Sequence, residues 1–113
     1  MHAFEIRIRY ADVDAMGWVY HGHYLRFFEI GRAEMMRALG RSYRDVEVED
    51  GVLLPVMEAR ARYLRGARYD ERVTVETGVI EVGRASVRFG YRLRGEDGAE
   101  LCVGTTEHCT TTR

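Results

Sequence analysis

The stretch Tyr24–Gly40, YLRFFEIGRAEMMRALG, carries the strongest structural signal in the chain. Apolar and small residues recur in it at spacings of three and four, which is the period of one face of an α-helix. Charged side chains occupy the other faces, and the closing glycine stands where helices commonly end. The pattern predicts one long amphipathic helix, whose inward face consists of Tyr24, Phe27, Phe28, Gly31, Met35, Ala38 and Leu39.

Gly31 is a glycine on the apolar face of this helix. Glycine within a helix costs about 1 kcal/mol relative to alanine. Its place on the inward face therefore predicts that another part of the backbone packs closely against it.

Strand patterns flank the helix on both sides. Phe4–Tyr10 alternates apolar and charged residues, as a half-buried strand does, and the segment 11–17 that follows predicts a loop. After the helix, the polar and acidic segment Ser42–Asp50 predicts another loop. Four more strands are predicted over Leu53–Leu64, Arg72–Val82, Arg84–Arg94 and Leu101–Thr110. The order of elements predicts an α+β domain in which one helix lies on a curved five-stranded antiparallel sheet, the last four strands forming a meander.

Composition restricts the class of protein. The 113 residues are enough for one domain, spanning 1–113, and 46% hydrophobic with 31% charged residues excludes a disordered chain. A net charge of −1 from 17 basic and 18 acidic residues gives no overall attraction for nucleic acid. No apolar run approaches the ~20 residues that span a bilayer, and the N-terminus lacks the features of a signal peptide. We expect a soluble cytoplasmic protein with no nucleic-acid or membrane partner.

All the basic residues are arginines, and the chain contains no Lys, Asn or Gln. The absence of amide side chains fits a thermostable protein. A coding bias toward arginine accounts for the pattern equally well.

The two cysteines, Cys102 and Cys109, belong to one predicted strand. At ~3.3 Å per residue they are roughly 23 Å apart, too far for a disulfide. His108 stands beside Cys109, but adjacent strand residues point to opposite faces. We expect structural thiols and no metal site.

The segment Tyr10–Leu25 concentrates side chains that could carry chemistry, since it places Asp12, Asp14, His21 and His23 between a strand and the start of a helix. Unpaired N–H groups at a helix start polarise a carbonyl and stabilise its oxyanion. A nearby carboxylate could activate water or attack directly. This combination would serve acyl transfer.

Other interpretations of these residues remain open. Either aspartate could hydrogen-bond loop backbone. The two histidines lack an acidic or thiol partner at ligand spacing, which disfavours a metal site. Trp18 and Tyr20 could line an acyl pocket or fill the core.

The segment Asp12–Leu25, DVDAMGWVYHGHYL, resembles the signature of hotdog-fold acyl-CoA thioesterases of the 4-hydroxybenzoyl-CoA thioesterase type. Within that group it is most similar to the bacterial short-chain branch associated with the Tol–Pal gene cluster. The later run Tyr63–Glu71 also matches, with Gly66 where proline is usual. With the order of elements, the resemblance covers nearly the whole chain.

The resemblance implies an activity and a set of site residues. The expected reaction is hydrolysis of small or medium acyl-CoA thioesters to the free acid and coenzyme A, with no cofactor. Asp14 takes the position of the catalytic carboxylate, as nucleophile or general base, and the backbone N–H of His21 polarises the thioester carbonyl. Substrate contacts fall on Trp18, Tyr20, Tyr24, Arg84 and Ser86.

Arg84 and Ser86 match the family's contact to a coenzyme A phosphate, but Ala85 replaces a basic residue between them. Arg60, Arg62 or Arg65 could contribute instead. The resemblance further implies a homo-oligomer, a dimer at minimum and more often a tetramer.

Two departures from the signature affect the acyl end of the substrate. Val13 stands where threonine is usual and Met16 where glycine is usual, so the acyl pocket could differ in size. Two rival functions on the same fold are a 3-hydroxyacyl thioester dehydratase or hydratase and a module that binds acyl thioesters without hydrolysing them. The first uses a His-Phe-Pro context that is absent around His21, and Asp14 argues against the second.

Overall fold

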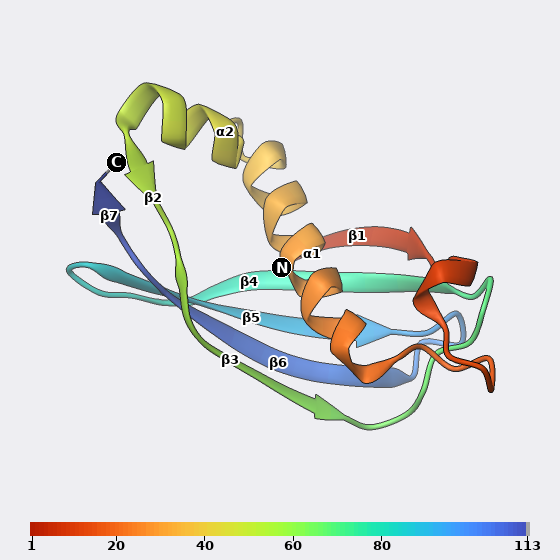
Figure 1. Cartoon of the computed structure of the whole chain (residues 1–113). Helices are drawn as coiled ribbons and strands as arrows, with labels where there is room; N and C mark the ends of the chain where they lie inside the picture. The colour runs from red at the N-terminus through yellow and green to blue at the C-terminus, as the bar shows by residue number, and fades with distance from the viewer. Residues whose placement is uncertain (113) are drawn as a thin grey trace.

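In the computed structural model, which describes residues 1–112, a five-stranded antiparallel sheet curves around helix α1 (Tyr24–Ala38), as Figure 1 shows. The sheet has the order β1-β4-β5-β6-β3. The predicted α+β hotdog architecture is confirmed. The strands of the sheet are β1 (His2–Arg7), β3 (Val56–Tyr63), β4 (Arg72–Val82), β5 (Ser86–Arg94) and β6 (Glu100–Cys109).

The predicted meander of the last four strands is wrong in one connection. Strands β4, β5 and β6 follow one another as hairpins, but β3 pairs with β6 at the far edge of the sheet and β1 takes the place beside β4. The cause is the connection after β3. Its residues Arg68 and Asp70 bond to the loop that follows β1, through a Trp18–Arg68 bridge and an Asp70 N–H···O=C Ile8 bond of 3.0 Å. The chain therefore crosses the end of the sheet instead of turning back on itself.

The predicted strand Leu53–Leu64 is broken at Pro55. Before the break, β2 (Val52–Leu53) leaves the main sheet and pairs with β7 (Thr111–Thr112). Proline has no N–H to donate to a strand partner, which favours a strand end at this point.

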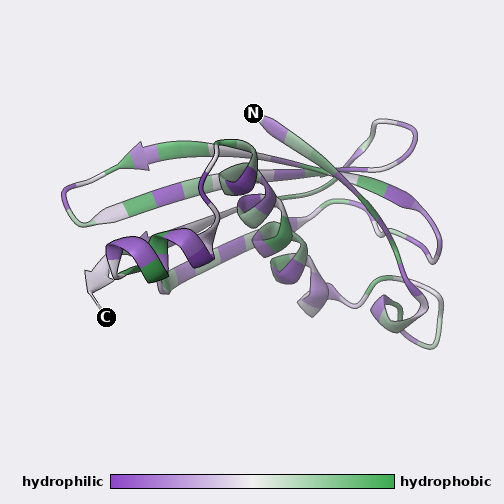
Figure 2. Ribbon diagram, turned by 90° about the horizontal axis from the view of Figure 1, so that it is seen from above, coloured by the Kyte–Doolittle hydropathy of each residue, from purple (hydrophilic) through white to green (hydrophobic). Residues whose placement is uncertain are grey.

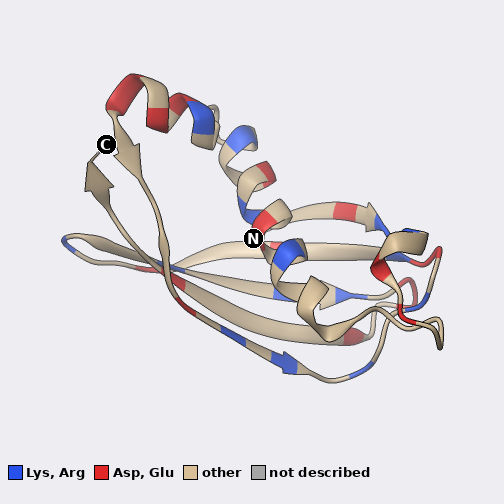
Figure 3. Cartoon of the chain, in the orientation of Figure 1, with Lys and Arg blue, Asp and Glu red and all other residues tan. Residues whose placement is uncertain are grey.

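The segment Ser42–Asp50 is helical, and the loop predicted there is wrong. It forms α2 (Tyr43–Asp45) followed by a π-helical turn (Val46–Asp50). Ser42 Oγ accepts from the Asp45 N–H at 3.1 Å, and the Asp45 carboxylate accepts from the Ser42 N–H at 3.2 Å. This reciprocal capping is a helix-start signal in the sequence. Figure 3 shows the acidic residues that gather on this projecting arm.

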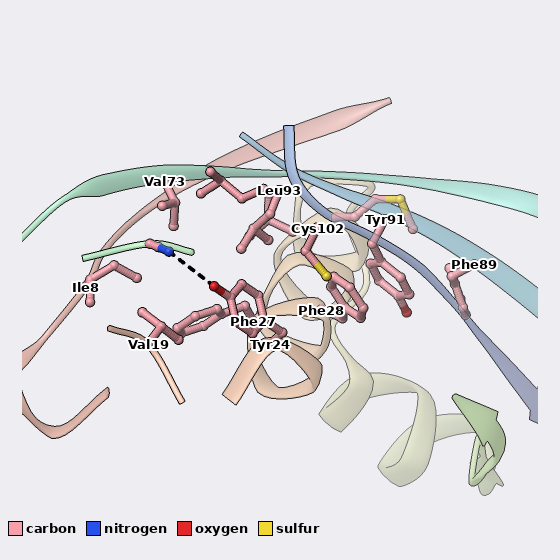
Figure 4. Packing of buried hydrophobic residues seen from close by; sticks show 14 residues of the cluster. Ile8, Val19, Tyr24, Phe27, Phe28, Val73, Phe89, Tyr91, Leu93 and Cys102 are labelled. Atoms are coloured by element: carbon pink, nitrogen blue, oxygen red, sulfur yellow. Dashed lines mark hydrogen bonds between the residues drawn. The ribbon is translucent and has the colours of Figure 1, made fainter. Parts of the chain in front are cut away.

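The core lies between α1 and the sheet. Hydrophobic and hydrophilic residues alternate along the strands, as Figure 2 shows. Since successive side chains of a strand point to opposite faces, the hydrophobic ones gather on the face that lies toward the helix. Figure 4 shows the aromatic part of the core, where the rings of Phe28 and Tyr91 stack at 4.5 Å. The sequence pattern missed Arg32, which is 7% exposed and donates to the hydroxyls of Tyr43 and Tyr91 beneath the helix.

Cys102 and Cys109 are free, as the sequence predicts. Burial raises the pKa of the Cys102 thiol to about 11, so it remains protonated and inert at neutral pH. No helix in the described part of the chain has the length and the apolar character needed to cross a membrane.

Gly31 is closely packed, as the sequence predicts, but against side chains of β4 and not against another backbone. A Cβ atom on this residue would lie 2.6 Å from Thr77 Oγ1 and would also collide with the side chain of Val75, both on β4. The absent side chain thus lets the helix backbone settle directly on the strand.

Gly31→Ala should lower the free energy of unfolding by about 1–3 kcal/mol, because the added methyl group overpacks the interface with β4. Helix propensity alone predicts the opposite sign, a gain of about 1 kcal/mol. Urea denaturation measures the difference. An unchanged or higher midpoint would show that the helix does not approach β4 this closely.

Candidate active site

Asp14 lies in a tight loop between β1 and α1. Val13 and Val19 pair across the base of this loop, and the Asp14 N–H donates to the Trp18 carbonyl at 2.7 Å. Gly17 closes the turn at a φ of 85°, a left-handed conformation that glycine adopts without strain. The backbone thus holds Asp14 at one end of the sheet.

The carboxylate of Asp14 is oriented through one of its two oxygens. Oδ1 accepts from the Met16 N–H at 2.8 Å and from the Trp18 N–H at 3.2 Å. Oδ2 has no hydrogen-bond donor among residues 1–112, and the side chain is exposed. One oxygen is therefore anchored while the other is available to a ligand.

Asp12 is placed differently, although it belongs to the same loop. Its side chain is 2% exposed and uses both oxygens within the protein: Oδ2 accepts from the Arg9 N–H at 2.8 Å, and Oδ1 forms an ion pair with Arg26 of α1. These bonds fasten the loop to the helix and leave no oxygen for a substrate.

His21 begins the 3₁₀ turn His21–His23, which runs directly into α1. In the described part of the chain, neither the His21 N–H nor the Gly22 N–H has an acceptor, as expected for the first residues of a helical segment. The His21 carbonyl accepts from the Tyr63 hydroxyl at 3.1 Å. Partial desolvation raises the pKa of Tyr63 above the ordinary value for tyrosine, and its phenol is a neutral donor at neutral pH. The helix start is thus held by β3 and presents two free N–H groups.

The three aromatic residues of the segment have different environments. Tyr24 is 3% exposed and belongs to the core, where its hydroxyl accepts from the Ala67 N–H at 3.3 Å (Figure 4). Tyr20 is 51% exposed, with its ring 4.4 Å from that of His21. Trp18 is half-buried against the segment after β3. Trp18 and Tyr20 therefore lie beside the helix start without filling the core.

Residues 1–112 contain no group of three or more His, Cys, Asp or Glu side chains arranged to hold a metal ion. At this end of the sheet, the unpaired polar groups of the segment 10–25 include Asp14 Oδ2 and the N–H groups of His21 and Gly22.

Arg84 and Ser86 lie at the opposite end of the molecule. They belong to the hairpin between β4 and β5, whereas the start of β4 adjoins the Asp14 loop (Figure 1). The 11 residues of β4 span about 33 Å at 3.3 Å per residue. One chain therefore does not bring Arg84 and Ser86 to its own Asp14.

A hollow of about 670 Å³ lies on the outer face of the sheet, away from α1. The groups around it are not those of acyl transfer. Among the residues that line it are Arg60, Arg62, Arg88, Arg92 and Glu58.

The residues that sequence reasoning missed lie in the run Tyr63–Glu71. Tyr63 binds the His21 carbonyl, and Arg68 pairs with Trp18 next to Asp14. The run was recognisable as a match to the family, but its spacing gave no indication that it packs against a loop some 50 residues earlier.

A family model described as the Thioesterase superfamily matches residues 16–102. The chain belongs to this superfamily. YneP of Bacillus subtilis is 35% identical over 104 residues, which cover 92% of this chain and 75% of YneP. Acyl-CoA thioesterase YbgC of Haemophilus influenzae is 37% identical over 91 residues, 80% of this chain and 67% of YbgC. The resemblance found in the sequence is confirmed.

The fold of this superfamily member is shared with solved structures. The DHNA-CoA thioesterase of Staphylococcus aureus superposes with a TM-score of 0.91 at 34% identity, over 97% of this chain and 73% of that one. The chain is therefore a thioesterase with a hotdog fold.

Asp12→Asn should destabilise this thioesterase by about 1–3 kcal/mol, because Arg26 and the Arg9 N–H lose a charged acceptor in a buried position. Turnover of the folded variant should remain close to that of the wild type. Urea denaturation and thiol release measure the two effects.

Asp50→Asn is the matched control, since Asp50 forms an exposed ion pair with Arg41 and should contribute less than about 0.5 kcal/mol. If Asp12→Asn were as stable as this control, Asp12 would not be what fastens the loop to α1.

Proposed function

We propose that this thioesterase hydrolyses small to medium acyl-CoA thioesters to the free acid and coenzyme A, with Asp14 as the reacting carboxylate. One observation carries the assignment: Asp14 Oδ1 is anchored by two backbone N–H groups, while Oδ2 is free at the same end of the sheet as the unpaired N–H groups of His21 and Gly22. The name of the Haemophilus relative supports an acyl-CoA substrate.

In the proposed reaction the thioester carbonyl oxygen accepts a hydrogen bond from the His21 N–H. The helix start stabilises the negative charge that develops on this oxygen. Asp14 Oδ2 then attacks the carbonyl carbon to form an anhydride that water hydrolyses, or removes a proton from water as the water attacks. Both routes break the C–S bond, release coenzyme A as its thiol and need the ionised carboxylate.

The acyl end of the substrate is assigned to the surface beside the helix start. Trp18 and Tyr20 are only partly covered there, and Met16 is 80% exposed on the Asp14 loop. These side chains offer apolar area to an acyl group close to the reacting carboxylate. Tyr24 supports the site from the core instead of contacting substrate.

The functional unit is proposed to be a dimer formed through β3. This strand is hydrogen-bonded on one side only, and its ends expose Val56, Met57 and Tyr63 by 51%, 66% and 49%. Exposed strand edges and apolar patches of this kind are usually covered by a partner. The accessible surface of 7022 Å² also exceeds the about 6,300 Å² expected for a compact monomer of 13.0 kDa.

Two-fold antiparallel pairing of β3 would place the Val56 end of one copy beside Tyr63, and hence His21, of the other. In the sheet Val56 adjoins His108, which adjoins Val87 just after Ser86. Two strand spacings amount to about 10 Å. The dimer would therefore bring Arg84 and Ser86 of the second copy toward Asp14, where a coenzyme A phosphate could accept from the guanidinium.

A tetramer is proposed to form through the outer face of the sheet. Arginines lie there together with glutamates, and the pairs are Arg88–Glu107 at 3.2 Å and Arg92–Glu100 at 2.9 Å. A surface that carries charges of both signs can form ion pairs with a second copy of itself.

Asp14→Asn keeps the size of the side chain but removes the negative charge and the reactive oxygen. The turnover number should fall by at least 10²–10⁴-fold, roughly the contribution of a positioned acid–base group. Release of free thiol from a panel of acyl-CoA substrates of increasing acyl size measures it. A folded, assembled variant that kept more than a tenth of wild-type kcat, a deficit of only ~1.4 kcal/mol, would remove Asp14 from the mechanism.

Arg84→Ala should raise KM for acyl-CoA and leave kcat nearly unchanged, because a remote phosphate contact contributes mostly uniform binding. Co-expression of Asp14→Asn with Arg84→Ala under two affinity tags gives mixed dimers. In each mixed dimer one site combines the intact Asp14 of one copy with the intact Arg84 of the other.

The purified mixed dimer should therefore show the wild-type KM. If it showed only the raised KM of Arg84→Ala, the arginine would not act across the dimer. A mass of 13.0 kDa by light scattering would contradict the dimer itself.

A further inference from the structure

We propose that Gly66 and Arg68 are positioning residues for Asp14 and act through Trp18. Trp18 is the only tryptophan of the chain and stands four residues after Asp14. The proposal rests on the reacting role of Asp14 argued above. The segment 66–68 thereby has an indirect part in the proposed catalysis.

The first step is the link between Trp18 and Asp14. The Trp18 N–H donates to Asp14 Oδ1 at 3.2 Å, and the Trp18 carbonyl accepts from the Asp14 N–H at 2.7 Å. Of the two N–H groups that orient the carboxylate, one thus belongs to Trp18. A displacement of this residue changes the direction of Oδ2.

The second step is the space that Gly66 leaves. A Cβ atom at this position would lie 2.7 Å from Cε3 and 3.1 Å from Cζ3 of the Trp18 indole. The φ of Gly66 is outside the left-handed region, so the backbone does not itself demand glycine here. The indole occupies the volume where a side chain of residue 66 would otherwise lie.

The third step is the contact with Arg68. Its guanidinium carbon lies 4.1 Å from the centre of the Trp18 ring, a favourable cation–π distance. In residues 1–112 no carboxylate lies within 4.0 Å of this guanidinium, so the ring is its main protein partner. The backbones of the two residues are bridged, and the Val19 N–H donates to the Ala67 carbonyl at 2.9 Å.

These contacts make the segment 66–68 a support for the Asp14 loop. Backbone bonds join the segment to Trp18 and Val19. The Arg68 guanidinium packs on the Trp18 ring, and the absence of a side chain at Gly66 leaves room for the indole. Because a 1 Å misplacement at a reacting centre can cost about 10²-fold in rate, a partial shift of Trp18 is enough to be measured.

The variant Gly66→Ala tests this support. It should lower kcat about tenfold, within the range for a misplaced group, and the fall in kcat should exceed any rise in KM that the displaced indole causes. Because Trp18 is the only tryptophan of the chain, tryptophan fluorescence reports on this position alone. Its emission wavelength or intensity should change. Gly78→Ala is the control, since its Cβ would meet only the Met1 side chain at 3.4 Å or more.

A second variant separates the indole from general damage to the loop. Phenylalanine at residue 18 is smaller, so Gly66→Ala combined with Trp18→Phe should turn over as fast as Trp18→Phe alone. Arg68→Lys should retain most of kcat, whereas Arg68→Met should lose it in the same way as Gly66→Ala. If the losses of Gly66→Ala and Trp18→Phe multiplied, the effect would not pass through the indole, and the proposal would be wrong.

The outcomes also separate this proposal from the role of Asp14. If Asp14→Asn stays active, the proposed chemistry fails, whatever Gly66→Ala does. If Asp14→Asn is inactive while Gly66→Ala has normal kcat and fluorescence, the positioning role alone fails. Added to Asp14→Asn, the Gly66→Ala change should cause no further loss of residual activity, since the group that it positions is already gone.

Discussion

The close approach of α1 to β4 at Gly31 sets the position of the helix, and the site depends on where that helix begins. The helix backbone rests on Val75 and Thr77 because residue 31 has no side chain. The same helix carries Arg26, which pairs with Asp12 and so fastens the preceding loop. Packing in the core thereby determines where the free N–H groups at His21 point.

The two aspartates of one short loop differ in burial and in how many of their oxygens the protein itself uses. Asp12 is almost completely buried, and both its oxygens are used by protein donors. Asp14 is exposed and commits only one oxygen. Both residues are aspartates and lie two positions apart in one loop, so only their three-dimensional surroundings distinguish them. Asp14 keeps one oxygen free because Asp12 makes the bonds that fasten the loop to α1.

The helix, the strands and the likeness to thioesterases were predictable, because periodicity and a contiguous motif are local properties of sequence. Asp14 and His21 were singled out from the same contiguous motif, and their part in the reaction stays a prediction. The edge position of β3 was not predictable, since it follows from long-range bonds between Arg68 and Trp18 and between Asp70 and Ile8, which are 50 and 62 residues apart in the sequence. The separation of Arg84 from Asp14 likewise depends on the length of β4. The helical segment after Ser42 depends on the capping pair of Ser42 and Asp45, whereas its acidic composition favoured a loop.

The central claim is that the start of the helix polarises the thioester carbonyl beside Asp14. The carbonyl stretch of an isotope-labelled acyl-CoA bound to Asp14→Asn measures that polarisation directly, because we expect the variant to bind the substrate without consuming it. Difference infrared spectra should show the labelled C=O band at lower wavenumber than in water, since the His21 N–H is a fixed donor at the start of a helix. A band at the position found in water would contradict the account.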